Sequence, residues 1–306
     1  MSATSRVTPL PKRAMARRPA PKARIHPFLF VLPSVVMLAV LLALPIGQAL
    51  LRTFQSDTGW GLDNYVRAIR DDHLARLAIG HTFSFAFFSV VGQYILGFGV
   101  ALILSGKLPF RAMFRVLFLL PWMFPAVVPG IVWRWIFDGL FGVLNEALYR
   151  VGYYAETDVP IAWLGQTSTA LGATIVANIW RGFPFMMILL LAGLQAVNHE
   201  LYEAASVDGA NAFRRFRDIT LPAMKGISFV AILLAWIGSF MNFAIVQVMT
   251  AGGPANASEV FATLVYKNAF LYADANYAAT LGILLLALLM IPGGLYVRAT
   301  VRSSRA

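Results

Sequence analysis

The stretch EAASVDGANAFRRFRDITLP, residues 203–222, is a polar segment between two long apolar runs. Its first part continues a helix-forming run, HELYEAASV, and its centre, DGA, is typical of a turn in which Asp208 can cap the helix that follows. The run NAFRRFRDI then favours a second short helix, which we expect to end at Leu221 and Pro222. The pattern predicts a helix-turn-helix elbow.

The second limb of this elbow carries an apolar stripe. Phe213, Phe216 and Ile219 recur three residues apart, whereas the arginines between them point to other faces of the helix. An exposed apolar stripe of this kind needs a partner. The periodicity leaves two partners open, namely the helix ends of this chain and a second protein.

The composition places this elbow in an integral membrane protein. Of the 306 residues, 59% are hydrophobic and 13% are charged, and the mean hydropathy is +0.70, which is too apolar for a soluble globular domain. A helix of about 20 apolar residues crosses a bilayer. Six runs are long enough to do so: 28–51, 82–105, 115–137, 170–195, 226–249 and 279–298. We therefore expect an all-α, polytopic fold with six transmembrane helices within residues 28–298.

Basic residues predict the orientation of these spans. Seventeen of the 25 Lys and Arg residues lie in the tail at 1–27, in the loops at 106–115 and 196–225, and at the C-terminal end. Cytoplasmic loops carry such an excess of positive charge. We expect a basic cytoplasmic tail at 1–27 and a cytoplasmic C-tail at 299–306. The formal net charge of +11 then reflects topology, and no nucleic-acid partner is expected.

The chemistry of the spans argues against several functions. None of the six runs contains Asp or Glu, so they lack the buried acid that an ion-coupled secondary carrier or an intramembrane protease commonly uses. The chain has no cysteine and only four scattered histidines, so no metal site is predicted. Phosphate-binding motifs are missing as well. A secondary carrier and an intramembrane enzyme remain as two disfavoured alternatives.

Prolines and one arginine interrupt the apolar runs. Pro121, Pro125 and Pro129 recur every four residues in the third run, and each removes a backbone donor, so we expect a broken or kinked helix there. Pro184 repeats the situation in the fourth run. Arg181 lies within that run, where a cation costs about 2.5 to 3.5 kcal/mol to insert. We therefore expect Arg181 to face water or a partner.

The elbow resembles the EAA loop of binding-protein-dependent ABC importer permeases. It fills every position of that pattern, and similarity to the sugar-importer members extends through motifs such as GLDNY, LPWMFPAVVPG, WRGFPFMM and VMTAGGP. The resemblance implies the type I ABC importer permease fold, with a coupling loop at 199–222 that docks on a separate ATPase subunit. The residues implied in this coupling are Glu203, Ala204, Ala205, Asp208, Gly209, Ala210, Phe213 and Phe216.

The resemblance also implies an activity and partners. The chain would be a non-catalytic subunit that moves a sugar or a related polyol or glycerol phosphate across a bacterial-type cytoplasmic (inner) membrane. Its partners would be a second, homologous permease in a heterodimer, two copies of a cytoplasmic ATPase subunit, an extracytoplasmic solute-binding protein and the lipid bilayer. No cofactor is expected on this chain, because ATP and Mg²⁺ would bind the ATPase.

A solute site in mid-membrane is a further implication of the resemblance. It falls on the third, fourth and fifth spans, at Trp122, Asn178, Arg181, Gly182, Phe185, Ser239 and Asn242. Aromatic rings that stack on a sugar, and amides or hydroxyls that hydrogen-bond to it, suit this chemistry. Trp122 and Phe185 stand where the maltose importer has tyrosines, and Ser239 replaces an asparagine. The pattern of solute hydroxyls that is read must therefore differ.

Each of these residues also has a structural alternative, which is packing or hydrogen bonding between helices. Arg181 either attracts an anionic solute or pairs with polar groups of the partner permease. Gly238, Asn242 and Ile245 are expected to share one face of the fifth span, which makes Asn242 the leading candidate for a solute contact.

Overall fold

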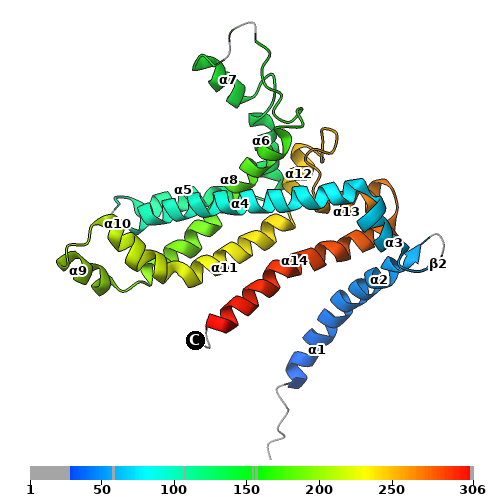
Figure 1. Ribbon diagram of the computed structural model, residues 1–306, viewed down its shortest axis with the longest axis horizontal. Coiled ribbons are helices and arrows are strands. Elements are labelled where there is room, and N and C mark those ends of the chain that lie inside the picture. The colour runs from blue at the N-terminus through cyan, green and yellow to red at the C-terminus, as the bar shows by residue number, and fades with distance from the viewer. Residues whose placement is uncertain (1–27, 57–58, 107, 154, 156–157, 304–306) are drawn as a thin grey trace, which may run out of the picture. The chain divides into compact units, whose positions relative to one another are not determined.

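The computed structural model describes residues 28–56, 59–106, 108–153, 155 and 158–303 (Figure 1). Within these residues, five helices are long and apolar enough to cross a membrane, and the bent pair Arg111–Met123 and Val127–Ile136 adds a sixth span if it counts as one. The predicted all-α, polytopic fold is confirmed. The basic tail predicted at 1–27 lies outside the described residues.

The chain divides into two parts, residues 1–47 and 48–306. The first part contains α1 (Phe28–Leu38), the π-helical segment η1 (Ala39–Ala43) and the start of α2 (Leu44–Thr53). These segments make up the first candidate span, Val31–Thr53, which is strongly apolar and contains one charged residue, Arg52, in its last turn.

Three long helices form the core of the second part. These are α4 (His73–Ser105), α8 (Ala170–Gln195) and α11 (Leu221–Phe240), which pack on one another. α4 and α8 approach closely at Gly97, where an added Cβ would lie 2.9 Å from Cβ of Met186. Side chains of one apolar cluster are fully buried between the helices: Leu104, Met186, Met187, Leu190 and Met224.

The third span is broken, as its prolines predict. α5 (Arg111–Met123) and α6 (Val127–Ile136) meet at an angle of 95°. Pro125 lies in the short break, where it cannot donate a backbone hydrogen bond. In Figure 1, α6 turns away from α4 and α5 and leads towards α7 (Val143–Arg150). The break leaves the last turn of α5 beside α8, where it can contribute to a site.

The fifth span differs from the prediction at both ends. The second limb of the elbow does not stop at Pro222, because α10 (Ala212–Arg215) continues through the π-helical segment η3 (Phe216–Thr220) into α11 without a break. Pro222, which has no backbone donor, directly follows the π-helical segment, where the hydrogen-bond register of the continuous helix changes. The span then ends early, at Phe240, and Asn242 lies in a short non-helical link.

This link has a local cause. Oδ1 of Asn242 accepts a hydrogen bond from the backbone N–H of Ile245 over 3.2 Å, which satisfies a free donor at the start of α12 (Ala244–Met249). Gly238, Asn242 and Ile245 therefore do not share the face of one continuous helix. The prediction of a helix over 226–249 was wrong at this point.

The remaining segments connect these spans. α9 (His199–Val207) and α10 lie at one end of the second part in Figure 1, whereas α13 (Phe261–Tyr266) and α3 (Asp63–Val66) lie at the other end. The shorter segments are β1 (Gln55–Ser56), β2 (Gly59–Trp60), α3 (Asp63–Val66), η2 (Arg67–Asp71), α13 (Phe261–Tyr266) and η4 (Lys267–Leu271), and the last span is α14 (Ala275–Ser303). β1 and β2 form one antiparallel pair, with Gln55 opposite Trp60.

Candidate functional site

A cavity of about 250 Å³ opens between α4, α5, α8 and α11. Ten residues line it: Gln93, Trp122, Asn178, Arg181, Gly182, Phe185, Leu234, Ala235, Gly238 and Ser239. Six of the seven solute residues implied by the sequence are among them, and Asn242 is not. The fold thus brings together residues that lie as far apart in the chain as Gln93 and Ser239.

Two aromatic rings form the apolar wall of the cavity. The rings of Trp122 on α5 and Phe185 on α8 are stacked, with 5.7 Å between their centroids and 20° between their planes. Trp122 remains 46% exposed, so the pair still presents a ring face. An exposed aromatic face of this kind suits the C–H surface of a sugar ring.

Buried amides form the polar wall. Nδ2 of Asn242 donates to Oδ1 of Asn178 over 2.9 Å, and Nδ2 of Asn178 donates to Oγ of Ser239 over 3.1 Å. Because Oδ1 of Asn242 also accepts a hydrogen bond from the N–H of Ile245, both ends of its amide are engaged within the chain. Asn242 therefore lies behind the wall and supports Asn178, whereas Ser239 reaches the cavity itself.

Gln93 is a lining residue that the sequence reasoning missed. Its Nε2 donates to the backbone carbonyl of Asn178 over 3.1 Å, and the residue is 4% exposed. Its amide lies against Gly182, where an added Cβ would come within 2.3 Å of Nε2. The available signal was a side-chain amide inside an otherwise apolar run, because polar groups in such runs usually face a partner or a cavity.

Arg181 lines the same cavity from α8. Its Nε is buried, and no hydrogen bond or ion pair joins its guanidinium to any residue that the structure describes. Desolvating a cation without a partner is unfavourable. The structure thus keeps both predicted roles open, a contact with a solute and a contact with a second permease.

The elbow forms a second candidate site, remote from the cavity. Gly209 adopts φ +75°, which favours glycine, and it joins α9 to α10. The predicted cap at Asp208 was wrong, because the side chain of Asn211 accepts from the N–H of Arg214 over 2.9 Å and begins α10. A cap lies immediately before the first helical turn, and Asp208 is too far from that turn to take this role.

The apolar stripe of the elbow divides between two environments. Phe213 is 69% exposed, whereas Phe216 packs on Phe98 of α4, with 5.9 Å between the ring centroids. The hydroxyls of Tyr202 and Thr220 are 2.9 Å apart and join the two limbs. The stripe therefore packs in part on this chain, through Phe216, whereas Phe213 remains at the surface.

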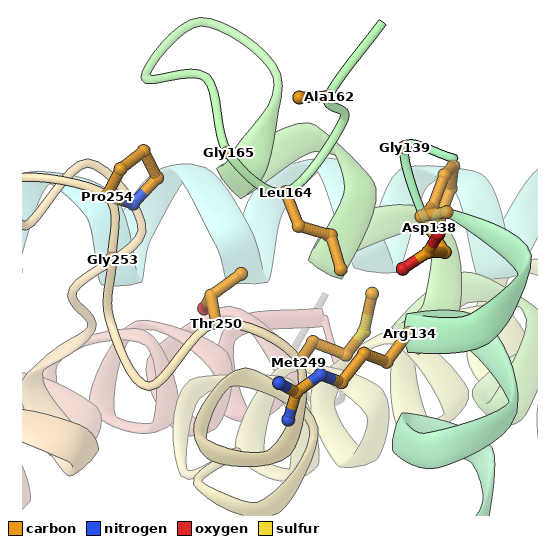
Figure 2. Close-up of a pocket in the computed structure, with 11 residues that line it drawn as sticks. Arg134, Asp138, Gly139, Ala162, Leu164, Gly165, Met249, Thr250, Gly253 and Pro254 are labelled. Atoms are coloured by element: carbon orange, nitrogen blue, oxygen red, sulfur yellow. The ribbon is translucent and has the colours of Figure 1, made fainter. Parts of the chain in front are cut away.

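A second cavity, of about 400 Å³, lies between the loops beyond α6 and α12 (Figure 2). Its lining includes Arg134 and Asp138 at the end of α6, and Thr250 and Pro254 in the loop after α12, and Figure 2 shows these two pairs on opposite sides of it. The N–H groups of Phe141 and Leu140 donate to Oδ1 of Asp138, and these bonds hold the pKa of that carboxyl below its ordinary value. None of the solute or coupling residues implied by the sequence lines this cavity.

A buried ion pair braces the loop that forms one side of this cavity. Nζ of Lys267 contacts Oε2 of Glu259, whose side chain is fully buried. Oγ of Ser258 donates to the carbonyl of Gly253 over 2.6 Å, and it lies 2.7 Å from Oγ1 of Thr250. The loop from 250 to 259 is therefore held by its own side chains and has a defined shape.

Comparison with known proteins agrees with this architecture. The chain is 34% identical to the trehalose/maltose transport system permease protein MalF of Thermococcus litoralis, over 78% of this chain and 82% of that protein. It is 31% identical to the sulfoquinovosyl glycerol transport system permease protein SmoG of Agrobacterium fabrum, over 90% of both chains. Its fold matches a subunit of a bacterial alginate ABC transporter, solved with an alginate pentasaccharide-bound periplasmic protein, at a TM-score of 0.79 and 20% identity. That match covers 91% of this chain and 95% of the other.

The family model for inner membrane components of binding-protein-dependent transport systems matches residues 93–305. This range contains the cavity, the broken third span and the elbow, and it covers more than half of the chain. The protein belongs to the family of binding-protein-dependent transport system inner membrane components.

Proposed function

We propose that this chain is the permease subunit of an ATP-driven importer that moves a sugar or a sugar derivative through the cavity between α5, α8 and α11. The observation that carries the proposal is the stacked pair of Trp122 and Phe185 opposite buried amide and hydroxyl groups. Aromatic faces and hydrogen-bonding groups together are what a sugar requires. The printed names of relatives, which refer to trehalose, maltose and sulfoquinovosyl glycerol, support this solute class.

Within this site, Trp122, Phe185 and Ser239 contact the solute, and Gly182 leaves space beside it. Asn178 donates a hydrogen bond to Ser239 and so holds its hydroxyl in place. The amide of Asn178 is held in turn by a hydrogen bond from Asn242. Residues from three spans thus converge on a cavity that one span alone could not build. Arg181 adds positive charge to the cavity, which favours solutes that carry a carboxylate, sulfonate or phosphate.

The elbow couples this path to ATP hydrolysis on a separate subunit. Three of its residues, Glu203, Ala204 and Phe213, are exposed, and the turn at Gly209 makes both α9 and α10 available to the ATPase. Phe216 links the elbow to α4, so a displacement of the elbow is transmitted to the helix that packs on α8.

Two ATPase subunits, a second permease and an external solute-binding protein complete the importer, and the chain itself catalyses no reaction. The elbow and both chain termini face the cytoplasm, as the basic loops indicate.

Reconstitution tests this function. The complete importer, with its binding protein, is placed in proteoliposomes and offered maltose, trehalose, sulfoquinovosyl glycerol and an alginate pentasaccharide in turn. We expect uptake of at least one of these sugars only when ATP reaches the ATPase, together with stimulation of ATP hydrolysis by the loaded binding protein. Uptake that an ion gradient drives without ATP would instead support a secondary carrier, and turnover of a solute by the purified single chain would support an enzyme.

A further inference from the structure

The residues implied by the sequence place every solute contact on the third, fourth and fifth spans, yet the cavity has a fourth wall on α4. Gln93 supplies this wall, and it is 4% exposed. The apolar run that contains it has no acidic or basic residue. A side-chain amide in such a position is costly unless its hydrogen-bonding groups find partners.

The orientation of the Gln93 amide follows from its neighbours. One terminal atom lies 3.1 Å from the backbone carbonyl oxygen of Asn178, and only the N–H group can face a carbonyl oxygen favourably. Gly182, one turn further along α8, gives the whole amide its space, because a Cβ there would lie 2.3 Å from Nε2 and 2.8 Å from Oε1. The hydrogen bond to the carbonyl of Asn178 then fixes which end of the amide is the donor.

Because Nε2 of Gln93 is the atom that donates to Asn178, the other terminal atom of the amide is the acceptor Oε1. No described residue donates a hydrogen bond to Oε1 of Gln93, and this residue lines the cavity together with Trp122, Phe185 and Ser239. The neighbouring amide of Asn178 is already engaged at both ends, because its oxygen accepts from Asn242 and its nitrogen donates to Ser239. Gln93 thus holds an acceptor without a described partner beside the hydroxyl of Ser239.

We propose that Gln93 is a solute-contacting, specificity-determining residue whose Oε1 accepts a hydrogen bond from a hydroxyl of the transported sugar. This inference rests on the proposed function, because it names a further residue of the same cavity. A sugar hydroxyl donates one proton, so a fixed acceptor recognises the position of that hydroxyl on the ring. Gln93 then selects among sugars, whereas the stacked rings of Trp122 and Phe185 accept many of them.

The first test replaces Gln93 by Met, which keeps the length of the side chain and removes the amide. In the reconstituted importer, we expect the uptake efficiency for the sugar identified among the four probes to fall about tenfold, with the melting temperature unchanged. Asn268→Leu is the matched control, since Asn268 is also a buried amide that donates to one backbone carbonyl, at 2.9 Å, but lies outside the cavity. It should leave uptake per assembled complex unchanged.

A second measurement separates recognition from support of the fold. Monodeoxy analogues of the same sugar are compared in the wild type and in Gln93→Met. The analogue that lacks the hydroxyl facing Gln93 should be transported equally by both proteins, whereas the other analogues should keep the tenfold difference. A uniform loss for all analogues, or a loss that follows a lower melting temperature, would overturn the inference and leave Gln93 with a packing role.

Gly182 provides an independent variant. Gly182→Ala displaces the Gln93 amide without altering it, so we expect the same change in selectivity among the deoxy analogues. The double variant Gln93→Ala with Gly182→Ala restores the space and should recover the melting temperature but not the selectivity. Recovery of both would contradict the inference. Absence of ATP-dependent uptake in the wild type would instead refute the proposed function, so the two failures are distinguishable.

Discussion

Asn242 donates a hydrogen bond from Nδ2 to Oδ1 of Asn178 over 2.9 Å, although 64 residues separate them in the chain. The bond joins the link after α11 to α8, and the same Asn242 side chain accepts a hydrogen bond from the N–H of Ile245 in the first turn of α12. Asn242 therefore holds three helices together at the wall of the cavity. This arrangement explains why it lies behind the residues that line the cavity.

From this bond we expect Asn242→Ala to act on stability. The change leaves the Oδ1 of Asn178 and the N–H of Ile245 without partners, and an unsatisfied buried group costs about 1 to 3 kcal/mol. The purified complex should melt earlier, while the assembled fraction retains solute selectivity. A large loss of uptake with an unchanged melting temperature would show that Asn242 contacts the solute after all.

The buried pair of Glu259 and Lys267 gives a second prediction. Lys267→Met leaves the Glu259 carboxylate buried without its cation, and such a loss destabilises by about 3 to 5 kcal/mol. Adding Glu259→Gln should recover much of that loss, which thermal melting of the complex can measure. Arg150→Met is the control, because its exposed pair with Glu146 should change stability by about 1 kcal/mol or less. Equal melting of the single and double variants would contradict a charged pair.

Coupling through the elbow gives a third prediction. Gly209→Pro cannot adopt φ +75°, because the proline ring fixes φ near −65°, and Glu203→Lys reverses an exposed charge beside the turn. Both proteins should reach the membrane yet lose uptake and the stimulation of ATP hydrolysis by the loaded binding protein. Gly226→Ala, in open space on α11, should behave as the wild type. Normal uptake and stimulation in either elbow variant would refute this coupling site.

The orientation of the chain gives a fourth prediction. A cysteine at exposed Ala255 should react with a membrane-impermeant maleimide in intact cells, and one at exposed Ala212 only after permeabilisation. The native chain has no cysteine, so the label reports only the introduced residue. The reverse pattern would place the elbow outside the cytoplasm and remove it from any cytoplasmic ATPase.

Much of the fold follows from periodicity and composition, because a lipid-facing helix must be apolar along its whole length. α8 begins at Ala170 and ends at Gln195, where the fourth apolar run was placed, and the prolines of the third run predicted its break. No proline or glycine marks the break after Phe240 in the sequence. It depends on the Asn242 side chain, which accepts from the N–H of Ile245 and donates to Asn178, 64 residues away.

The site was predicted from the resemblance, and its geometry required the structure. The cavity assembles the aromatic pair and Ser239 from three spans, and the wall formed by Gln93 could not be assigned without knowing which face of α4 meets Gly182. The role of Asn242 could not be read from the sequence either, because a buried amide that binds a sugar and one that caps a helix have the same local pattern.

Occupation of this cavity by a sugar can be measured with a single introduced thiol. Gly238 lines it and has open space around its Cα, so Gly238→Cys introduces a thiol into the otherwise cysteine-free chain at little steric cost. In the reconstituted importer, we predict that the transported sugar, delivered by its binding protein with ATP, slows maleimide labelling of this cysteine severalfold. Labelling of Gly226→Cys, which lies on α11 outside the cavity, should not change. An unchanged labelling rate at position 238 during active, ATP-dependent uptake would contradict the account, because the sugar would then follow another path.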